Sequence, residues 1–377
     1  MTPVHQAKVT FDCGPIAGGS AFIAPSAVIK ASTPAEVDHA WGAMQQAQSD
    51  GKWLAGYLSY ELGYLLSSKL SPLLPPDRQL PLVHFGVFDA PISGGVPLDH
   101  TPITLDQQQP LWDFLRYEEA FQTVHDYIVA GDIYQANLTF PLASRFDGTI
   151  EQLYAQLQLR QPVRHGALVD LGGTALLSRS PELFFKLSAD GKLATRPMKG
   201  TAPRGNTVAE DDAFRDELQM SDKNRAENLM IVDLLRNDMS RVSEIGSVTV
   251  LELFAVERFA TLHQMTSCIT SKVRNGTTFK ELFGALFPCG SITGAPKVRA
   301  MQIIREIETQ PREAYCGSIG WIAPSGAMEF NVAIRTLQCH PDQTVQMNVG
   351  GGVVYDSTAR SEYDEAMLKS RFADLSQ

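Results

Sequence analysis

The segment that is most informative about the fold of this chain is residues 166–188, GALVDLGGTALLSRSPELFFKLS. Apolar residues alternate with small or polar ones on both sides of the pair Gly172-Gly173. Alternation with a period of two is typical of half-buried β-strands, and glycine pairs between such runs are typical of turns. The stretch therefore predicts antiparallel strands joined by glycine turns.

Helical and extended segments surround this stretch without βαβ regularity. The segment 117–130 predicts an amphipathic helix, because Phe121, Val124 and Ile128 share a face and Gly131 stands at a C-terminal cap position. Further helices are predicted at 34–48, 208–239, 296–308 and 360–375, and further strand character at 53–66, 316–323, 330–338 and 345–355. The order of strands, helices, strands and helix favours one large α+β core.

A change of composition divides the chain near residue 110. Residues 89–110, DAPISGGVPLDHTPITLDQQQP, are rich in Pro, Gly and Thr and carry little apolar periodicity, so they predict a long loop or linker. We therefore expect an N-terminal region, residues 1–110, that is integrated with the core, and a catalytic core at 111–377.

Composition and charge limit the class of protein. The chain has 377 residues, 44% of them hydrophobic and 20% charged, with 32 Lys+Arg against 42 Asp+Glu and a net charge of -10. An acidic chain of this kind is a poor partner for nucleic acid or an anionic membrane. We see no secretory signal and no run of about 18 apolar residues. The five scattered cysteines fit reduced thiols, so we expect a cytoplasmic protein.

The predicted closing helix carries the first candidate for chemistry. In SEYDEAMLKS, residues 361–370, the spacing places Glu362, Glu365 and Lys369 on one helical face. The ordinary alternative is a solvated face with an ion pair. Before this helix, Gly350-Gly351-Gly352 let backbone N–H groups close on an anion such as a carboxylate, although a bulge or turn explains them equally well.

Glu227 is a candidate ligand for a hard metal. It lies in SDKNRAENLMIVDLLRND, residues 221–238, a segment whose apolar positions indicate burial. Mg²⁺ is bound by one or two carboxylates together with waters and substrate oxygens, and Glu365 on a separate helix is the natural partner. The alternative is an ion pair of Glu227 with Arg225 or Arg236.

Glu182 is a candidate general acid. In SRSPELFFKL it precedes Leu183, Phe184 and Phe185, and burial beside such neighbours raises the pKa of a carboxyl group. The alternative is a side chain that points out of its strand into water.

The segment 287–302, FPCGSITGAPKVRAMQ, leads a glycine-rich loop into a helix whose first amides could face an anion. It lacks the spacing of a nucleotide P-loop. Cys289 has no base nearby in sequence and is predicted to be a small core residue.

Lys199 lies in RPMKGTAPRG, residues 196–205, where two prolines and two glycines predict a turn. Two interpretations are open. Lys199 is either a solvated loop cation or an amine placed there to react.

Six motifs, in order, now identify a family. PMKGTAPRG, AENLMIVDLLRND, GSITGAPKVRAM, CGSIGW, AIRTL and GGGVVYDS together resemble the chorismate-utilising enzymes over residues 117–377, and GYLSYELGY before them is similar too. The resemblance implies two large antiparallel β-sheets packed together with helices outside, and a Mg²⁺-dependent site for chorismate.

The resemblance also implies roles for individual residues. Glu227 and Glu365 match the metal ligands, with Glu362 beside them, and Glu182 matches the general acid for the C4 hydroxyl. The remaining matches are contacts to the ring carboxylate (Gly200, Thr201, Lys369), contacts to the enolpyruvyl carboxylate (Tyr315, Arg335, Gly350, Gly351), and a histidine near the departing group (His263). Asn224 departs from the pattern, because relatives often carry an acidic residue there, so it is not expected to bind metal.

Two positions separate the branches of the family. Gln135 stands where isochorismate-type members carry a lysine that activates water, so water is not expected to be the nucleophile. Lys199 stands where anthranilate-forming members carry alanine. The resemblance thus implies an enzyme that makes 4-amino-4-deoxychorismate for p-aminobenzoate and folate synthesis, through a covalent adduct of Lys199 with C2 of chorismate.

Three alternatives remain open at this stage. They are an anthranilate-forming enzyme, a non-catalytic chorismate-binding subunit, and a Schiff-base lysine enzyme. The chain shows no glutaminase nucleophile motif with a partnered histidine, so we expect a separate glutamine amidotransferase subunit to supply the ammonia.

Overall fold

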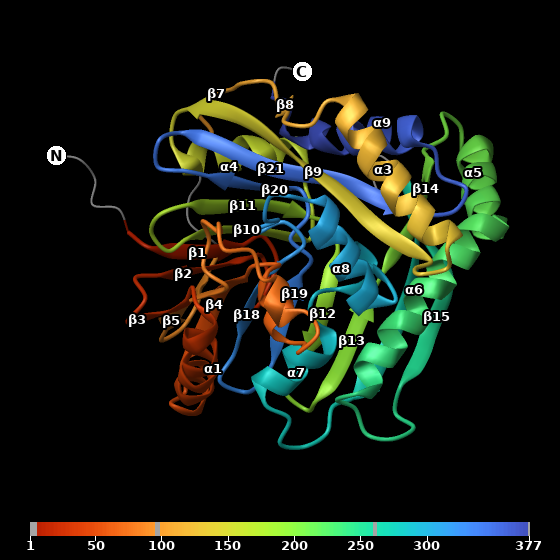
Figure 1. The fold of residues 1–377 in the computed structure, drawn as a ribbon. Helices are drawn as coiled ribbons and strands as arrows, with labels where there is room; N and C mark the ends of the chain where they lie inside the picture. The colour runs from red at the N-terminus through yellow and green to blue at the C-terminus, as the bar shows by residue number, and fades with distance from the viewer. Residues whose placement is uncertain (1–5, 95–98, 259–261, 376–377) are drawn as a thin grey trace.

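The computed structural model describes residues 6–94, 99–258 and 262–375, and it consists of two large antiparallel sheets with helices around them (Figure 1). This confirms the predicted α+β fold. The first sheet, sheet A, contains in order β17 (Gly294–Ala295), β9 (Gln135–Asp147), β21 (Thr344–Val353), β20 (Thr336–Cys339), β11 (Ala175–Ser180), β10 (His165–Asp170), β1 (Lys8–Phe11), β2 (Ser20–Ile23) and β6 (Ile92–Ser93), with β7 (Thr104–Leu105) and β8 (Gln109–Pro110) paired to β9.

The second sheet, sheet B, is built in the same antiparallel manner. It contains in order β14 (Met198–Pro203), β16 (Leu262–Lys272), β13 (Lys192–Arg196), β12 (Leu183–Leu187), β19 (Met328–Asn331), β18 (Ser318–Ile322), β4 (Trp53–Leu58), β5 (Val83–Phe88) and β3 (Ala27–Ala31), with β15 (Thr249–Arg258) paired to β16.

The stretch 166–188 crosses from one sheet to the other. Strands β10 and β11 pair antiparallel, with Leu168 opposite Leu177, as the alternation predicts. The chain then leaves sheet A after Ser180, and β12 joins sheet B beside β13 and β19. The segment 330–338 divides in the same way between β19 and β20. Glu182 and Arg335 therefore lie at two crossings between the sheets.

The helices cover the outer faces of the sheets. They are α1 (Pro34–Ser49), α2 (Leu62–Leu65), α3 (Phe114–Val129), α4 (Ile150–Arg160), α5 (Val208–Met220), α6 (Asp222–Ser240), α7 (Phe279–Leu286), α8 (Lys297–Ile307) and α9 (Ala359–Ser370), with short 3₁₀ turns η1 (Ser71–Leu73), η2 (Gly290–Ile292) and η3 (Arg371–Ala373). Helices α3, α4, α8 and α9 share a hydrophobic core with sheet A, and α1, α6 and α7 share one with sheet B. A third core joins Val9 and Leu176 of sheet A to Tyr57 and Trp321 of sheet B.

Two helical predictions need correction. The single helix predicted at 208–239 is two helices, α5 and α6, because Ser221 leaves the helical conformation and its hydroxyl accepts the N–H of Asn224 at 3.4 Å. The helix predicted at 360–375 begins at Ala359 but ends at Ser370, where η3 follows. The helices predicted at 34–48, 117–130 and 296–308 correspond to α1, α3 and α8.

Residues before position 110 contribute strands to both sheets. In sheet A, β1 pairs with β10 (Val9 opposite Val169), and in sheet B, β4 pairs with β18 (Tyr57 opposite Ile319). The predicted linker contains β6, β7 and β8, while its residues 95–98 lie outside the described residues. A functional division of the chain at residue 110 stays a prediction. Within the described ranges, every helix is too short or too polar to cross a membrane.

Candidate active site

A cavity of about 150 Å³ opens where the two sheets meet near α9. Seven residues proposed from the sequence line it, and they come from segments far apart in the chain: Glu182, Lys199, Tyr315, Arg335, Gly350, Gly351 and Lys369. The structure therefore brings together the predicted acid, the predicted nucleophile and the predicted carboxylate contacts.

Glu182 is buried, so its side chain does not point into water as the alternative interpretation had it. Only 6% of the residue is exposed, and its Oε1 accepts a hydrogen bond from the Ser291 hydroxyl at 2.8 Å. Burial raises the pKa of Glu182 from 4.5 to about 7, against the opposing effects of Ser291 and Lys199. A carboxyl group of this kind is able to hold and donate a proton near neutral pH.

Lys199 lies on β14 with its amine inside the cavity wall. Burial lowers the pKa of this amine, and the charge of Lys369 lowers it further, whereas the carboxylates of Glu227, Glu182 and Glu365 raise it. A Cβ atom on Gly352 would lie 3.2 Å from Lys199 Nζ and 2.7 Å from Gln135 Nε2. The amine therefore packs against the glycine strand, with the amide of Gln135 beside it.

The turn after Lys199 depends on Gly200. Its φ of +80° is a left-handed conformation that favours glycine, and a Cβ there would lie 2.8 Å from the Asn224 Oδ1 atom. The Gly200 carbonyl accepts a hydrogen bond from Gln264 Nε2 at 2.7 Å, and the exposed Thr201 donates to Gln264 Oε1 at 3.3 Å. Gly200 and Thr201 lie next to the cavity wall without lining it.

Two cations and a phenol also line the cavity. Arg335 has a φ of +49°, an uncommon conformation for a non-glycine residue, at the crossing from β19 to β20. Burial lowers its pKa, although a guanidinium remains charged at all physiological pH values. Tyr315 is buried beside it. Lys369 on α9 donates to the Gly350 carbonyl at 3.0 Å, so this cation contacts the glycine strand directly.

The acidic residues of α6 and α9 surround the amine but do not form a closed metal site. Lys369 pairs with Glu365 at 2.8 Å, and Glu362 accepts the Ser357 hydroxyl at 2.7 Å. Burial and the neighbouring Glu365 charge raise the pKa of Glu362. Across the part of the chain that the structure describes, no group of three or more His, Cys, Asp or Glu side chains is arranged to hold a metal ion.

The donor chemistry of these carboxylates nevertheless fits Mg²⁺. Glu227 and Glu365 come from separate helices, and the charge of each acts on the Lys199 amine. Neither of them, nor Glu362, is among the residues that line the cavity. Mg²⁺ commonly takes only one or two carboxylates and completes its shell with waters and substrate oxygens.

His263 lies outside the cavity lining. It is fully buried on β16, and its Nε2 lies 2.8 Å from the Asp211 carboxylate on α5. Its Nδ1 has no hydrogen-bond partner among the described residues. On β16, His263 lies opposite Ala202 of the neighbouring strand β14. A catalytic role for His263 stays a prediction.

The loop at 287–302 contributes a residue that the sequence analysis missed. Cys289 is buried and its pKa is raised to about 12, which confirms the predicted core role. The loop also carries Ser291, whose hydroxyl donates a hydrogen bond to Glu182. An anion site at the start of the following helix stays a prediction. Asn137, Asn348 and Gly352 also line the cavity. Gly352 belongs to the glycine run named from the sequence, and the available signal for Asn348 was its place on the same strand, two residues before Gly350.

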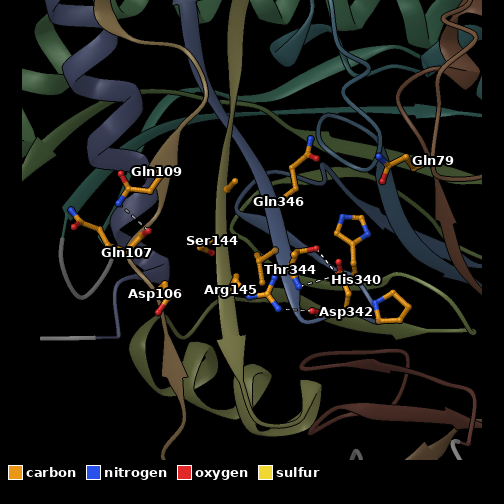
Figure 2. A pocket seen from close by; sticks show the side chains of 13 residues that line it. Gln79, Asp106, Gln107, Gln109, Ser144, Arg145, His340, Asp342, Thr344 and Gln346 are labelled. Atoms are coloured by element: carbon orange, nitrogen blue, oxygen red, sulfur yellow. Dashed lines mark hydrogen bonds between the residues drawn. The ribbon is translucent and has the colours of Figure 1, made fainter.

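A larger groove of about 930 Å³ lies at the other ends of β9 and β21 (Figure 2). Its labelled side chains are polar or charged, with several glutamines among them. Two of its charged residues bond within the wall: Arg145 donates to the Asp342 carbonyl at 2.9 Å, and Asp342 accepts the Thr344 hydroxyl at 2.6 Å. None of the predicted acid, nucleophile or carboxylate contacts lies there. The smaller cavity is therefore the candidate active site.

Comparison with known proteins shows the family of this chain. Residues 96–373 match the family described as chorismate binding enzyme. The chain is 44% identical over 253 residues to aminodeoxychorismate synthase component 1 of Salmonella typhimurium, covering 67% of this chain and 55% of that protein. It is 36% identical over 255 residues to anthranilate synthase component 1 of Aquifex aeolicus, covering 68% of this chain and 51% of that protein. The match thus spans about half the length of these relatives.

Solved structures show the same fold. The structure of anthranilate synthase component I from Streptococcus pneumoniae superimposes with a TM-score of 0.79 at 23% identity, covering 99% of this chain and 93% of that one. The menaquinone-specific isochorismate synthase of Escherichia coli superimposes with a TM-score of 0.76 at 17% identity, covering 99% and 88% of the two chains.

Proposed function

The chain belongs to the family of chorismate binding enzymes, and we propose that it acts as an aminodeoxychorismate synthase component 1, converting chorismate and ammonia to 4-amino-4-deoxychorismate. The observation that carries this proposal is one cavity lined by both a buried amine, Lys199, and a buried acid whose pKa is about 7, Glu182.

The first step joins Lys199 to the substrate. The neutral amine attacks C2 of chorismate, the two ring double bonds shift, and the C4–O bond breaks. Glu182 gives its proton to the departing hydroxyl, which leaves as water. The lowered pKa of Lys199 increases the neutral fraction of the amine, and burial of Glu182 keeps its proton available.

The second step exchanges the two amines. Ammonia attacks C4, the double bonds shift back, and the C2–N bond to Lys199 breaks with return of the free amine. The proton released by the incoming nitrogen goes to the ionised Glu182. The enolpyruvyl group stays in place, so the nitrogen ends on the carbon that carried the hydroxyl.

The carboxylates of the substrate meet the charged groups of the cavity. Arg335, Tyr315 and the Gly350 and Gly351 amides are suited to the enolpyruvyl carboxylate, and Lys369, Gly200 and Thr201 to the ring carboxylate. Glu227 and Glu365, with Glu362 nearby, would hold Mg²⁺, which when bound supplies a positive charge for the ring carboxylate and offsets the acidic residues. We propose no catalytic task for His263 beyond its place beside β14.

The proposal includes a partner and a cellular setting. A glutamine amidotransferase subunit would supply ammonia, because relatives named "component 1" imply a second component. The product would serve p-aminobenzoate and folate synthesis. The five free thiols fit the reducing cytoplasm that we propose as the location.

The test supplies chorismate, MgCl₂ and ammonium salt to the wild type and to Lys199→Ala, with Lys280→Ala, an exposed lysine on α7, as a matched control. We expect aminodeoxychorismate from the wild type and the control, and loss of its formation in Lys199→Ala. Intact-mass analysis is expected to find a chorismate-derived adduct on Lys199. Anthranilate as the wild-type product would overturn the proposal, and full activity of Lys199→Ala would remove the covalent step.

A further inference from the structure

We propose that Arg312 is a positioning residue that fixes two walls of the active-site cavity and, through Ser291, the orientation of Glu182. This proposal rests on the function proposed above. Neither Arg312 nor its partner Glu308 lines the cavity, so both would act from behind it.

Arg312 is one of the largest fully buried side chains among the described residues, with 2% of the residue exposed. Its guanidinium makes a two-pronged ion pair with Glu308: Nε donates to Glu308 Oε2 at 2.7 Å, and Nη2 donates to Glu308 Oε1 at 2.7 Å. The ring of Tyr60 covers the guanidinium at 4.7 Å. This arrangement fixes both the position and the plane of the guanidinium.

The remaining donors reach two chain segments that are far apart in sequence. Nη2 donates to the Asn137 carbonyl on β9 at 2.6 Å, and Nη1 donates to the Ile292 carbonyl in η2 at 3.1 Å. Both Asn137 and Ile292 line the cavity. Because the guanidinium is planar and rigid, it sets the distance between these two walls.

One of these walls carries the contact to the acid. Ser291 precedes Ile292, and its hydroxyl donates to Glu182 Oε1 at 2.8 Å. A shift of the Ile292 carbonyl would therefore move the hydroxyl that orients Glu182.

The other wall carries the surroundings of the amine. Asn137 lies opposite Gly352 in the β9–β21 register, and Gly352 packs against Lys199 Nζ. Glu308 strengthens this wall, because its Oε1 also accepts the N–H and the hydroxyl of Thr139 at 2.9 and 3.0 Å. The Arg312–Glu308 pair thus lies behind both reacting groups.

The residues before 110 hold this cluster from the opposite side. Glu61, which is buried in GYLSYELGY, accepts the backbone N–H groups of Arg312 at 2.7 Å and of Glu313 at 3.1 Å. A buried ion pair is often no more stabilising than apolar residues of the same volume. The hydrogen bonds from Arg312 to the Asn137 and Ile292 carbonyls hold two cavity walls together, and this explains why a charged pair lies here.

The experiment compares Arg312→Lys with Arg179→Lys. Arg179 is equally buried, but its side chain bonds to Asp12, Tyr154 and the Gln161 carbonyl, none of which lines the cavity. Lysine keeps the positive charge in both variants, but it lacks the rigid, planar guanidinium and its set of N–H donors. We expect Arg312→Lys to lower kcat by about 10- to 100-fold, since small misplacements of reacting groups have effects of this size. KM for chorismate should change little, because Arg335 and Lys369 are untouched, and Arg179→Lys should retain kcat.

A double-mutant cycle with Ser291→Ala tests the route of the effect. If Arg312 acts through Ser291, the losses in kcat caused by the two substitutions will not add. Hydrogen exchange is expected to rise at the Asn137 and Thr139 amides in Arg312→Lys and to stay unchanged there in Arg179→Lys. If Arg312→Lys does not fold, Glu308→Gln, which keeps the volume, replaces it in the same measurements.

The inference is overturned if kcat per folded molecule is unchanged in Arg312→Lys, if Arg179→Lys loses as much, or if the losses with Ser291→Ala are fully additive. The rate is followed as chorismate consumption, whichever product forms. A wild type that makes a different product, or consumes no chorismate, contradicts the proposed function alone, since the exchange measurement still tests whether Arg312 fixes the two walls.

Discussion

The space between the two sheets has an apolar end and a polar end, and the two differ in how fully their groups are satisfied. At the apolar end, Phe22 packs against Phe11, Trp53 and Phe88 with ring centroids 5.3–6.0 Å apart. At the polar end, both amide atoms of Gln135 and the Oδ1 atom of Asn348 are buried without a partner among the described residues.

The difference shows which end stabilises the fold and which end is kept for a ligand. Buried polar atoms without partners cost free energy, and native proteins keep few of them. Three such atoms, on Gln135 and Asn348, lie at the polar end, where a bound molecule would satisfy them. The unpaired polar atoms lower the stability of the fold at the polar end, and the packed rings at the apolar end raise it.

Replacement of the acid should have the largest effect. We expect Glu182→Gln to lower kcat by about 10²–10⁴-fold, the usual contribution of a general acid. Measurement of kcat for chorismate consumption checks this, with Glu329→Gln as the control, since Glu329 is also a largely buried carboxylate but pairs with His165 and Lys186 outside the cavity. Wild-type activity in Glu182→Gln would mean that the polar end contains no acid catalyst at this position.

Truncation at the apolar end should change stability and leave chemistry intact. Phe22→Ala is expected to lower the free energy of unfolding by about 3–5 kcal/mol, because it removes a fully buried ring. Urea denaturation measures the loss, and kcat per folded molecule should stay at the wild-type value. A loss of kcat in the folded variant would show that the two ends are coupled.

The polar end should become more stable when its acid is neutralised. The pKa of Glu182 is raised from 4.5 to about 7, so the folded chain keeps this proton to a higher pH than the unfolded chain does. The stability that this group contributes is therefore present below pH 4.5 and is lost as the pH rises through about 7.

Glutamine does not titrate, so Glu182→Gln should equal the wild type in stability near pH 4.5 and exceed it above pH 7. A shift of this size corresponds to at most about 3 kcal/mol. Thermal or urea unfolding across this pH range measures the difference. A constant difference at all pH values would contradict the burial of the charge.

A single methyl group on the glycine strand should have the smallest effect. Gly352→Ala places a Cβ 2.7 Å from Gln135 Nε2 and 3.2 Å from Lys199 Nζ, both of them ends of flexible side chains. We expect kcat to fall by about 10- to 100-fold with little change in stability. Gly42→Ala on α1, where a Cβ meets nothing within 4 Å, is the control and should retain activity. An unchanged kcat would show that the amine has room to move.

Motifs predicted most, but not all, of the candidate residues that come to line one cavity. One cavity is lined by five residues that could be predicted because each occurs in a short motif of fixed order. They are Glu182, Lys199, Tyr315, Arg335 and Lys369. His263 and Thr201 also match motifs, yet hydrogen bonds to Asp211 and Gln264 hold them outside the lining. The break at Ser221 went unpredicted because a serine within a helical pattern does not by itself show whether it caps a new helix.

The sequence by itself determined the fold class, the family and the candidates for the reacting groups, because alternation, glycine turns and short motifs depend only on neighbouring residues. Only the tertiary structure decided the protonation of Glu182, since desolvation and the contact with Ser291, 109 residues away, depend on which segments pack together. The same holds for Arg312. Its four hydrogen bonds, to β9, to η2 and to Glu308 at the C-terminal cap of α8, exist only once the two sheets and their helices have closed around it.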